Sequence, residues 1–197
     1  SAASDVYKRQ QYDWIWAAVG SHPDDAEQVD EARIGEYRAL CKDPRVKAIG
    51  EIGLDYAGTV GREAQLRIFR EQLDWAERLG KPVVLHCVKA FEAVMRELAP
   101  HALRAVIFHG FIGSSQQAAE AIKKGYYLSF GERTFRSPRT VEALRRTPVE
   151  NLFAETDESD VPIEEIYRRI AQAKDLDPEL LKCAIYRNCL LYTSPSP

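Results

Sequence analysis

The stretch Val46-Lys-Ala-Ile-Gly-Glu-Ile-Gly-Leu-Asp-Tyr56 begins as a short apolar run, which is typical of a strand buried on both faces. Near the end of this run, Glu51 stands between Gly50 and Gly53. A carboxylate in a buried strand is unfavourable unless a cation compensates it, and small neighbours leave room for such a cation. Two interpretations therefore stay open for Glu51: a member of a functional site, or a structural partner of an Arg or Lys from a nearby helix.

Apolar runs and helix-like segments alternate on both sides of this stretch. Segment 61–80 is predicted to be a helix, because its apolar residues recur at spacings of three and four and Gly80 is placed to end it. These residues are Leu66, Phe69, Leu73, Ala76 and Leu79. Strands are expected at 14–20, 46–56, 82–87, 105–110, 126–130 and 151–155, and further helices include 27–42, 114–125 and 178–188. The alternation predicts parallel strands joined by right-handed crossovers.

Two α/β folds have this pattern, a closed barrel and an open doubly wound sheet. No Gly-x-Gly-x-x-Gly or Gly-x-x-x-x-Gly-Lys loop follows an expected strand, which weighs against a nucleotide-binding open sheet. The expected strands are fewer than the eight that close a barrel. We therefore expect a (β/α)8 TIM-barrel type of fold with only about six of its eight strands present, the first two being absent.

Composition places the chain among globular proteins with one sizeable core. It has 197 residues, of which 45% are hydrophobic, and a formal net charge of −3, so any contact with nucleic acid would be local. No apolar run reaches the roughly 18 residues that span a bilayer. The four cysteines have no Cys-x-x-Cys spacing, which favours reduced thiols and a cytoplasmic location.

The two ends differ in character from the middle of the chain. Residues 1–10 are polar and follow no helix or strand period, and 189–197 end in Thr-Ser-Pro-Ser-Pro after a helix predicted to stop at Asn188. We expect 1–10 and 189–197 to be non-native tails and 11–188 to be a truncated barrel.

Polar residues of the metal-ligand and acid–base types stand at the ends of four expected strands. They are Glu51, His86, His109 and Asp157. In a barrel these strand ends converge on the face where active sites occur. Imidazole and carboxylate ligands together suit Zn²⁺, Mn²⁺ or a similar ion, with Mg²⁺ possible where carboxylates dominate. A metal-activated water is a nucleophile at neutral pH, so metal-assisted hydrolysis is the leading reaction class.

Five motifs in order resemble those of the TatD family of metal-dependent hydrolases. They are Gly20-Ser-His-Pro23, Gly50-Glu-Ile-Gly-Leu-Asp-Tyr56, Leu85-His86, Phe108-His-Gly-Phe111 and Glu155-Thr-Asp157. The resemblance implies a (β/α)8 barrel of the amidohydrolase-like group, two divalent metal ions (Mg, Mn or Zn) and a DNA substrate, single-stranded or at ends. It also implies that Glu51 bridges the ions, that His86 and His109 hold one of them, and that Asp157 holds the other and helps to deprotonate the water.

The chain departs from the family pattern at the first strand, because no His-x-His pair is present. We therefore expect this chain to be weakly active or inactive. His22 could contact substrate, although a turn-forming His-Pro is an equal alternative, and Arg133 and Arg136 could meet phosphate oxygens or form a solvated rim. Asp55 is expected to shape its loop.

The function expected is a divalent-metal-dependent deoxyribonuclease of the TatD type, with Glu51 and Asp157 as catalytic carboxylates. Hydrolysis of an amide, ester or aminoacyl bond by another amidohydrolase-like site is an alternative, because such metal sites act on carbon and phosphorus centres alike. A non-catalytic fragment is the other alternative. Neither a membrane nor an obligate protein partner is implied.

Overall fold

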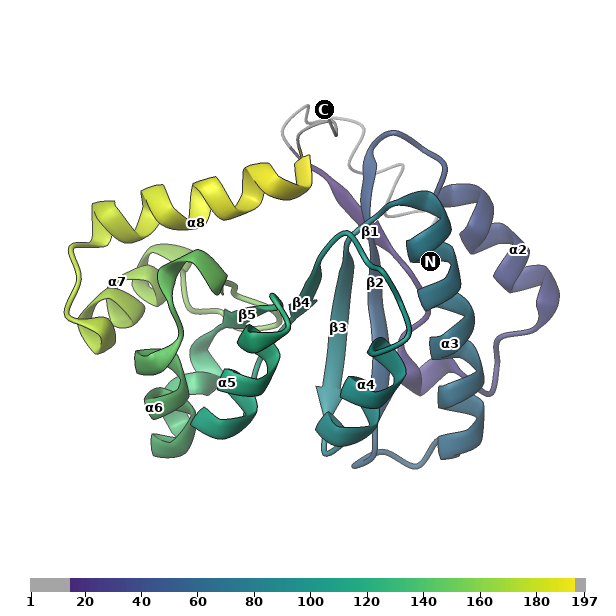
Figure 1. Ribbon diagram of the computed structural model, residues 1–197, viewed down its shortest axis with the longest axis horizontal. Coiled ribbons are helices and arrows are strands. Elements are labelled where there is room, and N and C mark those ends of the chain that lie inside the picture. Colours follow the sequence, from purple (N-terminus) through teal and green to yellow (C-terminus); the bar gives the residue numbers. More distant parts are fainter. Residues whose placement is uncertain (1–14, 194–197) are drawn as a thin grey trace. The chain divides into compact units, whose positions relative to one another are not determined.

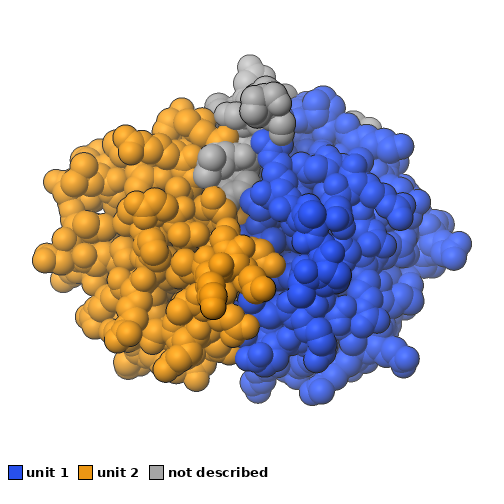
Figure 2. Space-filling model, in the orientation of Figure 1, with its two compact units in different colours: residues 1–106 blue, residues 107–197 orange. Residues whose placement is uncertain are grey.

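The computed structural model describes residues 15–193 and divides the chain into two compact units, which meet in sequence between Val106 and Ile107 (Figures 1 and 2). Strands alternate with helices in both units, as the sequence predicts. The predicted tail 1–10, the first residue of the expected strand 14–20, and residues 194–197 lie outside the described part of the chain.

The first unit is a parallel sheet with helices between its strands. Its elements are β1 (Ala17–Val19), the 3₁₀ helix η2 (Pro23–Asp25), α2 (Glu31–Leu40), β2 (Val46–Asp55), α3 (Arg62–Leu79), β3 (Val83–Val88) and α4 (Phe91–Leu98). β2 pairs with β1 on one side and with β3 on the other, both in parallel. α3 packs against β2, and Leu54, Phe69 and Leu73 are among the fully buried side chains of this core.

Helix α3 lies where the apolar spacing predicts it, from Gly61 as N-cap to Gly80 as a left-handed C-cap. Its buried face is rotated slightly from the predicted one, since Ile68 and Trp75 are buried whereas Leu66 and Leu79 are half-buried. Two glutamines, which the sequence pattern counts as polar, also lie on this buried face and are described below.

The second unit repeats the strand–helix alternation. Its elements are β4 (Val106–Phe108, whose first residue belongs to the first unit), α5 (Ser115–Lys123), β5 (Tyr127–Phe130), the 3₁₀ helix η3 (Glu132–Arg136), α6 (Pro138–Arg146), the 3₁₀ helix η4 (Val149–Asn151), β6 (Leu152–Ala154), α7 (Ile163–Lys174) and α8 (Pro178–Thr193). β5 pairs in parallel with β4 and with β6. Ser114 caps α5 in a capping box with Gln117, and Ser137 caps α6 ahead of its proline, as predicted.

Two predicted helix boundaries are wrong. α2 begins at Glu31 and not at 27, because the Asp30 side chain accepts a hydrogen bond from the Arg33 N–H and caps the helix there. α8 continues through Cys189 to Thr193; its leucines are good helix formers, and the first proline after Pro178 is Pro195. Within residues 15–193, no helix combines the length and apolar character needed to cross a bilayer.

Candidate metal centre

The glycines of β2 determine how closely β3 approaches. A Cβ atom on Gly50 would lie 2.7 Å from the Cβ of Val84, and one on Gly53 would lie 2.0 Å from the carbonyl oxygen of His86. Gly53 also has a φ of 142°, which L side chains rarely adopt. The room that these two glycines leave is therefore filled by residues of β3. The same close approach fixes His86 opposite Gly53.

Glu51, His86 and His22 form the first group of candidate ligands. One ligand atom from each lies within 4.8 Å of the others. The side chain of Glu51 is exposed, which corrects the expectation of a buried carboxylate: the other residues of this end of β2 are buried, while Glu51 turns to the side where the two imidazoles lie. The rings of His22 and His86 meet edge to face with centroids 4.3 Å apart.

His86 is held by Asp55, at the end of β2. The Nε2 atom of His86 lies 3.0 Å from Oδ2 of Asp55, while Oδ1 accepts hydrogen bonds from the N–H groups of Ala57 and Gly58. Burial acts to raise the pKa of Asp55, but the hydrogen bonds from His86 and the two backbone groups outweigh it, so the pKa lies below its usual value. Asp55 thus shapes its loop, as expected, and also contacts a candidate metal ligand.

His22 is placed by its own turn. Its side chain caps η2, with Nδ1 accepting a hydrogen bond from the N–H of Asp24 at 3.2 Å. Burial, and then the neighbouring His86, lower the pKa of His22, which favours the neutral imidazole. Because Nδ1 is an acceptor, the neutral ring carries its proton on Nε2 and presents a hydrogen-bond donor. The turn-forming role of His22 is therefore confirmed, and its contact with substrate stays a prediction.

Two buried glutamines of α3, Gln65 and Gln72, anchor the loops that carry these residues. Gln72 accepts a hydrogen bond from the Ser21 N–H at 2.6 Å and donates to the Ser21 carbonyl at 3.2 Å. Gln65 accepts from the Asp55 N–H at 2.8 Å and donates to the Asp55 carbonyl at 2.8 Å. Each side-chain amide thus bonds the backbone N–H and carbonyl of one loop residue, in the way that a neighbouring strand would. Neither glutamine was predicted from the sequence to support the site.

His109, Glu155 and Asp157 form the second group, and their ligand atoms also lie within 4.8 Å of one another. His109 follows β4 directly, and its Nδ1 atom lies 3.4 Å from Oε1 of Glu155. Gly110 has a positive φ of 52°, and a Cβ atom there would lie 3.3 Å from the same carboxylate oxygen. Glu155 follows β6 and was not predicted as a site residue, although its position directly after the strand was the available signal.

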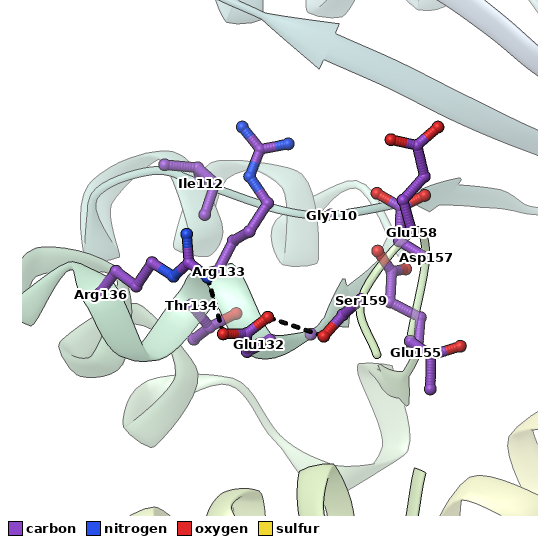
Figure 3. A pocket seen from close by; sticks show the side chains of 12 residues that line it. Gly110, Ile112, Glu132, Arg133, Thr134, Arg136, Glu155, Asp157, Glu158 and Ser159 are labelled. Carbon is purple, nitrogen blue, oxygen red and sulfur yellow. Dashed lines mark hydrogen bonds and ion pairs between the residues drawn. The ribbon is translucent and has the colours of Figure 1, made fainter. Parts of the chain in front are cut away.

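A cavity of about 230 Å³ opens beside this second group (Figure 3). Arg133 and Arg136 reach it from η3, and Glu155, Asp157 and Glu158 line the opposite side. Arg136 donates a hydrogen bond to Glu132 at 2.7 Å, so the charge of Arg136 is already compensated. Glu132 also accepts a hydrogen bond from the Ser159 hydroxyl at 2.7 Å. Arg133 makes no hydrogen bond or ion pair with the part of the chain that the structure describes, and its guanidinium extends along the cavity.

The structure thus brings Glu51 together with His86, and His109 together with Asp157. The resemblance implies that His86 and His109 hold one ion and that Glu51 and Asp157 hold another. Each of these pairs has one residue in each unit, and this arrangement stays a prediction. Both groups fit a divalent ion on the chemistry of their donors, since each combines imidazole nitrogen with carboxylate oxygen. Zn²⁺ and Mn²⁺ suit such mixed sets, and the second group, with two carboxylates, also suits Mg²⁺.

Solved structures with the same fold are known. The crystal structure of YjjV, a TatD homologue from Escherichia coli K12, matches 98% of this chain and 82% of its own length with a TM-score of 0.91 and 28% sequence identity. A TatD family hydrolase from Entamoeba histolytica matches 97% of this chain and 79% of its own length with a TM-score of 0.83 and 21% identity. The predicted fold class, an α/β fold of the TatD barrel type with parallel strands, is confirmed.

Proteins of similar sequence also include metal-dependent hydrolases and TatD proteins. The metal-dependent hydrolase YabD of Bacillus subtilis is 36% identical over 153 residues, which cover 75% of this chain and 60% of the relative. The 3'-5' ssDNA/RNA exonuclease TatD of Cronobacter turicensis is 34% identical over 154 residues, covering 75% and 59%. The chain thus spans about 60% of the length of these relatives. The model of the family described as TatD related DNase matches residues 2–192, and the chain belongs to this family.

Proposed function

We propose that this protein is a divalent-metal-dependent phosphodiesterase that acts on single-stranded nucleic acid, most of all DNA, in the cytoplasm. The observation that carries the proposal is that the structure gathers two groups of imidazole and carboxylate ligands, with Glu51 and His86 within β2 and β3 and with His109, Glu155 and Asp157 just after β4 and β6. The exonuclease named among the relatives supports the substrate class. Free thiols at Cys41, Cys87 and Cys183 support the location.

Glu51, His86, His109 and Asp157 would hold up to two divalent ions. A bound ion of this kind supplies a Lewis acid and lowers the pKa of its water towards about 7. Asp157 is exposed at the cavity, where its carboxylate can accept the proton of an attacking water.

Contacts to the substrate come from two donors. The Nε2–H of His22 can donate to an anionic oxygen beside Glu51. The guanidinium of Arg133 can pair with a phosphate oxygen at the cavity, because no described carboxylate compensates it. Arg136 makes a weaker contribution, since its charge is engaged by Glu132.

The test is degradation of a fluorescently labelled single-stranded oligonucleotide by excess purified protein, with Mn²⁺, Mg²⁺ or Zn²⁺ and with a chelator. We expect slow, metal-dependent cleavage that Glu51→Gln and Asp157→Asn each reduce at least ~10-fold. Glu92→Gln, which removes the charge of an exposed helix residue outside both groups, should leave the rate unchanged.

Two results would contradict the proposal. One is cleavage that persists at the same rate in both carboxylate variants, because it would come from another source. The other is turnover confined to a panel of amide and ester substrates, which would assign the site to acyl hydrolysis.

A further inference from the structure

We infer that Asp55 is a positioning residue that fixes the tautomer of His86, so that Nδ1 of His86 is the nitrogen that binds metal. The inference rests on the proposed function only in taking His86 as a metal ligand. It assigns to Asp55 a role beyond its loop, and it names the ligand atom.

The first step is the direction of the hydrogen bond between the two side chains. Nε2 of His86 lies 3.0 Å from Oδ2 of Asp55, and the side chains are only 17% and 15% exposed, so water competes weakly for this bond. An ionised carboxylate only accepts, and therefore Nε2 must carry the proton. The lone pair of the neutral ring then lies on Nδ1, and a neutral imidazole with its second nitrogen bonded to a carboxylate is a well-oriented metal ligand.

The second step is that Asp55 cannot turn away. Its other oxygen, Oδ1, accepts from the N–H groups of Ala57 and Gly58 at 2.8 and 3.0 Å. Its backbone N–H and carbonyl are both bonded to the amide of Gln65, which also donates to the carbonyl of Val60. Backbone and carboxylate are thus fixed from three directions, which leaves Oδ2 directed at His86.

The third step is what an amide would do in the same place. In Asp55→Asn the two backbone N–H groups require the amide oxygen to stay on their side, because an NH₂ group there would meet two other donors. The NH₂ group must then face Nε2 of His86, which can only accept. The imidazole proton moves to Nδ1 and occupies the position of the lone pair, so the variant keeps the loop and loses the ligand.

His22 provides an internal contrast. Its Nδ1 accepts a backbone hydrogen bond, which leaves the proton on Nε2 and makes the ring a donor. The two neighbouring histidines therefore have different roles within one group: His86 contributes a lone pair to metal, and His22 contributes an N–H to an anionic oxygen.

The first experiment records the tautomers of the metal-free, ¹⁵N-labelled protein near pH 8 by long-range ¹H–¹⁵N correlation of the imidazoles. We expect His86 as Nε2–H in the wild type and as Nδ1–H in Asp55→Asn. Glu77→Gln is a matched control. Glu77 contacts Nδ1 of His101 at 2.8 Å and accepts a hydrogen bond from the Ala102 N–H at 3.1 Å, as Asp55 does with its own histidine and backbone. The same exchange of carboxylate for amide should therefore change the tautomer of His101 alone.

The second experiment measures Co²⁺ affinity by titration calorimetry, with Asp55→Ala as a further variant. Asp55→Ala removes the loop anchor, so a purely structural role predicts that it weakens binding more than Asp55→Asn. The tautomer role predicts the opposite order, with Asp55→Asn losing at least ~10-fold and Glu77→Gln losing nothing.

A wild-type His86 found as Nδ1–H, or an Asp55→Asn variant still found as Nε2–H, would overturn the inference. So would the affinity order that the structural role predicts. A wild-type protein that binds no Co²⁺ would instead contradict the proposed function, and the spectra would still decide whether Asp55 sets the tautomer.

Discussion

Replacing Gly53 by alanine tests whether the glycine of β2 positions His86. The added Cβ would lie 2.0 Å from the His86 carbonyl oxygen and 3.0 Å from its carbonyl carbon. Both are backbone atoms of a paired strand, so no side-chain rotation relieves the contact. Backbone strain at positive φ costs about 1–3 kcal/mol, and overpacking costs about 1–3 kcal/mol. We therefore expect Gly53→Ala to lower the free energy of unfolding by roughly 2–6 kcal/mol.

Gly80→Ala is the matched control, because Gly80 also has a positive φ, 59°, but a Cβ there would meet nothing within 4 Å. This variant should lose only the left-handed strain of about 1–2 kcal/mol. Urea denaturation followed by circular dichroism gives both values. Equal losses in the two variants would refute the reasoning, because they would show that β3 does not approach Gly53 as closely as the structure has it.

Two further predictions concern buried groups of the first unit. Gln72→Leu should destabilise the fold by about 2–4 kcal/mol in urea denaturation, since it leaves the buried N–H and carbonyl of Ser21 without partners, and a loss below about 1 kcal/mol would contradict this role. Burial raises the pKa of Cys41 to about 11 and that of Cys87 to about 12, so both stay protonated thiols at pH 8 and gain reactive thiolate only as the pH approaches those values. Mass spectrometry after maleimide labelling of the native protein at pH 8 should therefore find the exposed Cys183 modified well before either, and rapid labelling of the half-buried Cys87 would argue against its raised pKa.

The sequence predicted those features that depend on local spacing. Segment 46–56 became β2, and α3 runs between Gly61 and Gly80 because its apolar period and terminal glycines are strong local signals. The rule that parallel strands end on one edge predicted that Glu51, His86, His109 and Asp157 converge. The structure brings Glu51 near His86 and His109 near Asp157, and the meeting of all four stays a prediction.

The features that the sequence did not predict depend on tertiary contacts, which the spacing of residues along the chain does not reveal. Gln65 and Gln72 are polar in any sequence pattern, and only the structure shows that their amides replace absent backbone partners inside the core. The exposure of Glu51 was missed because the apolar run around it suggested burial on both faces. The two roles of Asp55, in its loop and against His86, require knowing that β3 ends beside it.

The two buried glutamines of α3 also bear on the dynamics of the site. They are seven residues apart on one helix, about 10 Å along its axis, and each accepts the N–H of a residue beside the candidate ligands: Gln72 that of Ser21, and Gln65 that of Asp55. Each of these amide protons is bonded to its glutamine oxygen, so its exchange with solvent requires that bond to open. Native-state hydrogen exchange should therefore release these two protons in a single sub-global opening with one free energy, although they are 34 residues apart in the chain. The fluctuation that undocks α3 would disassemble the first ligand group as a unit.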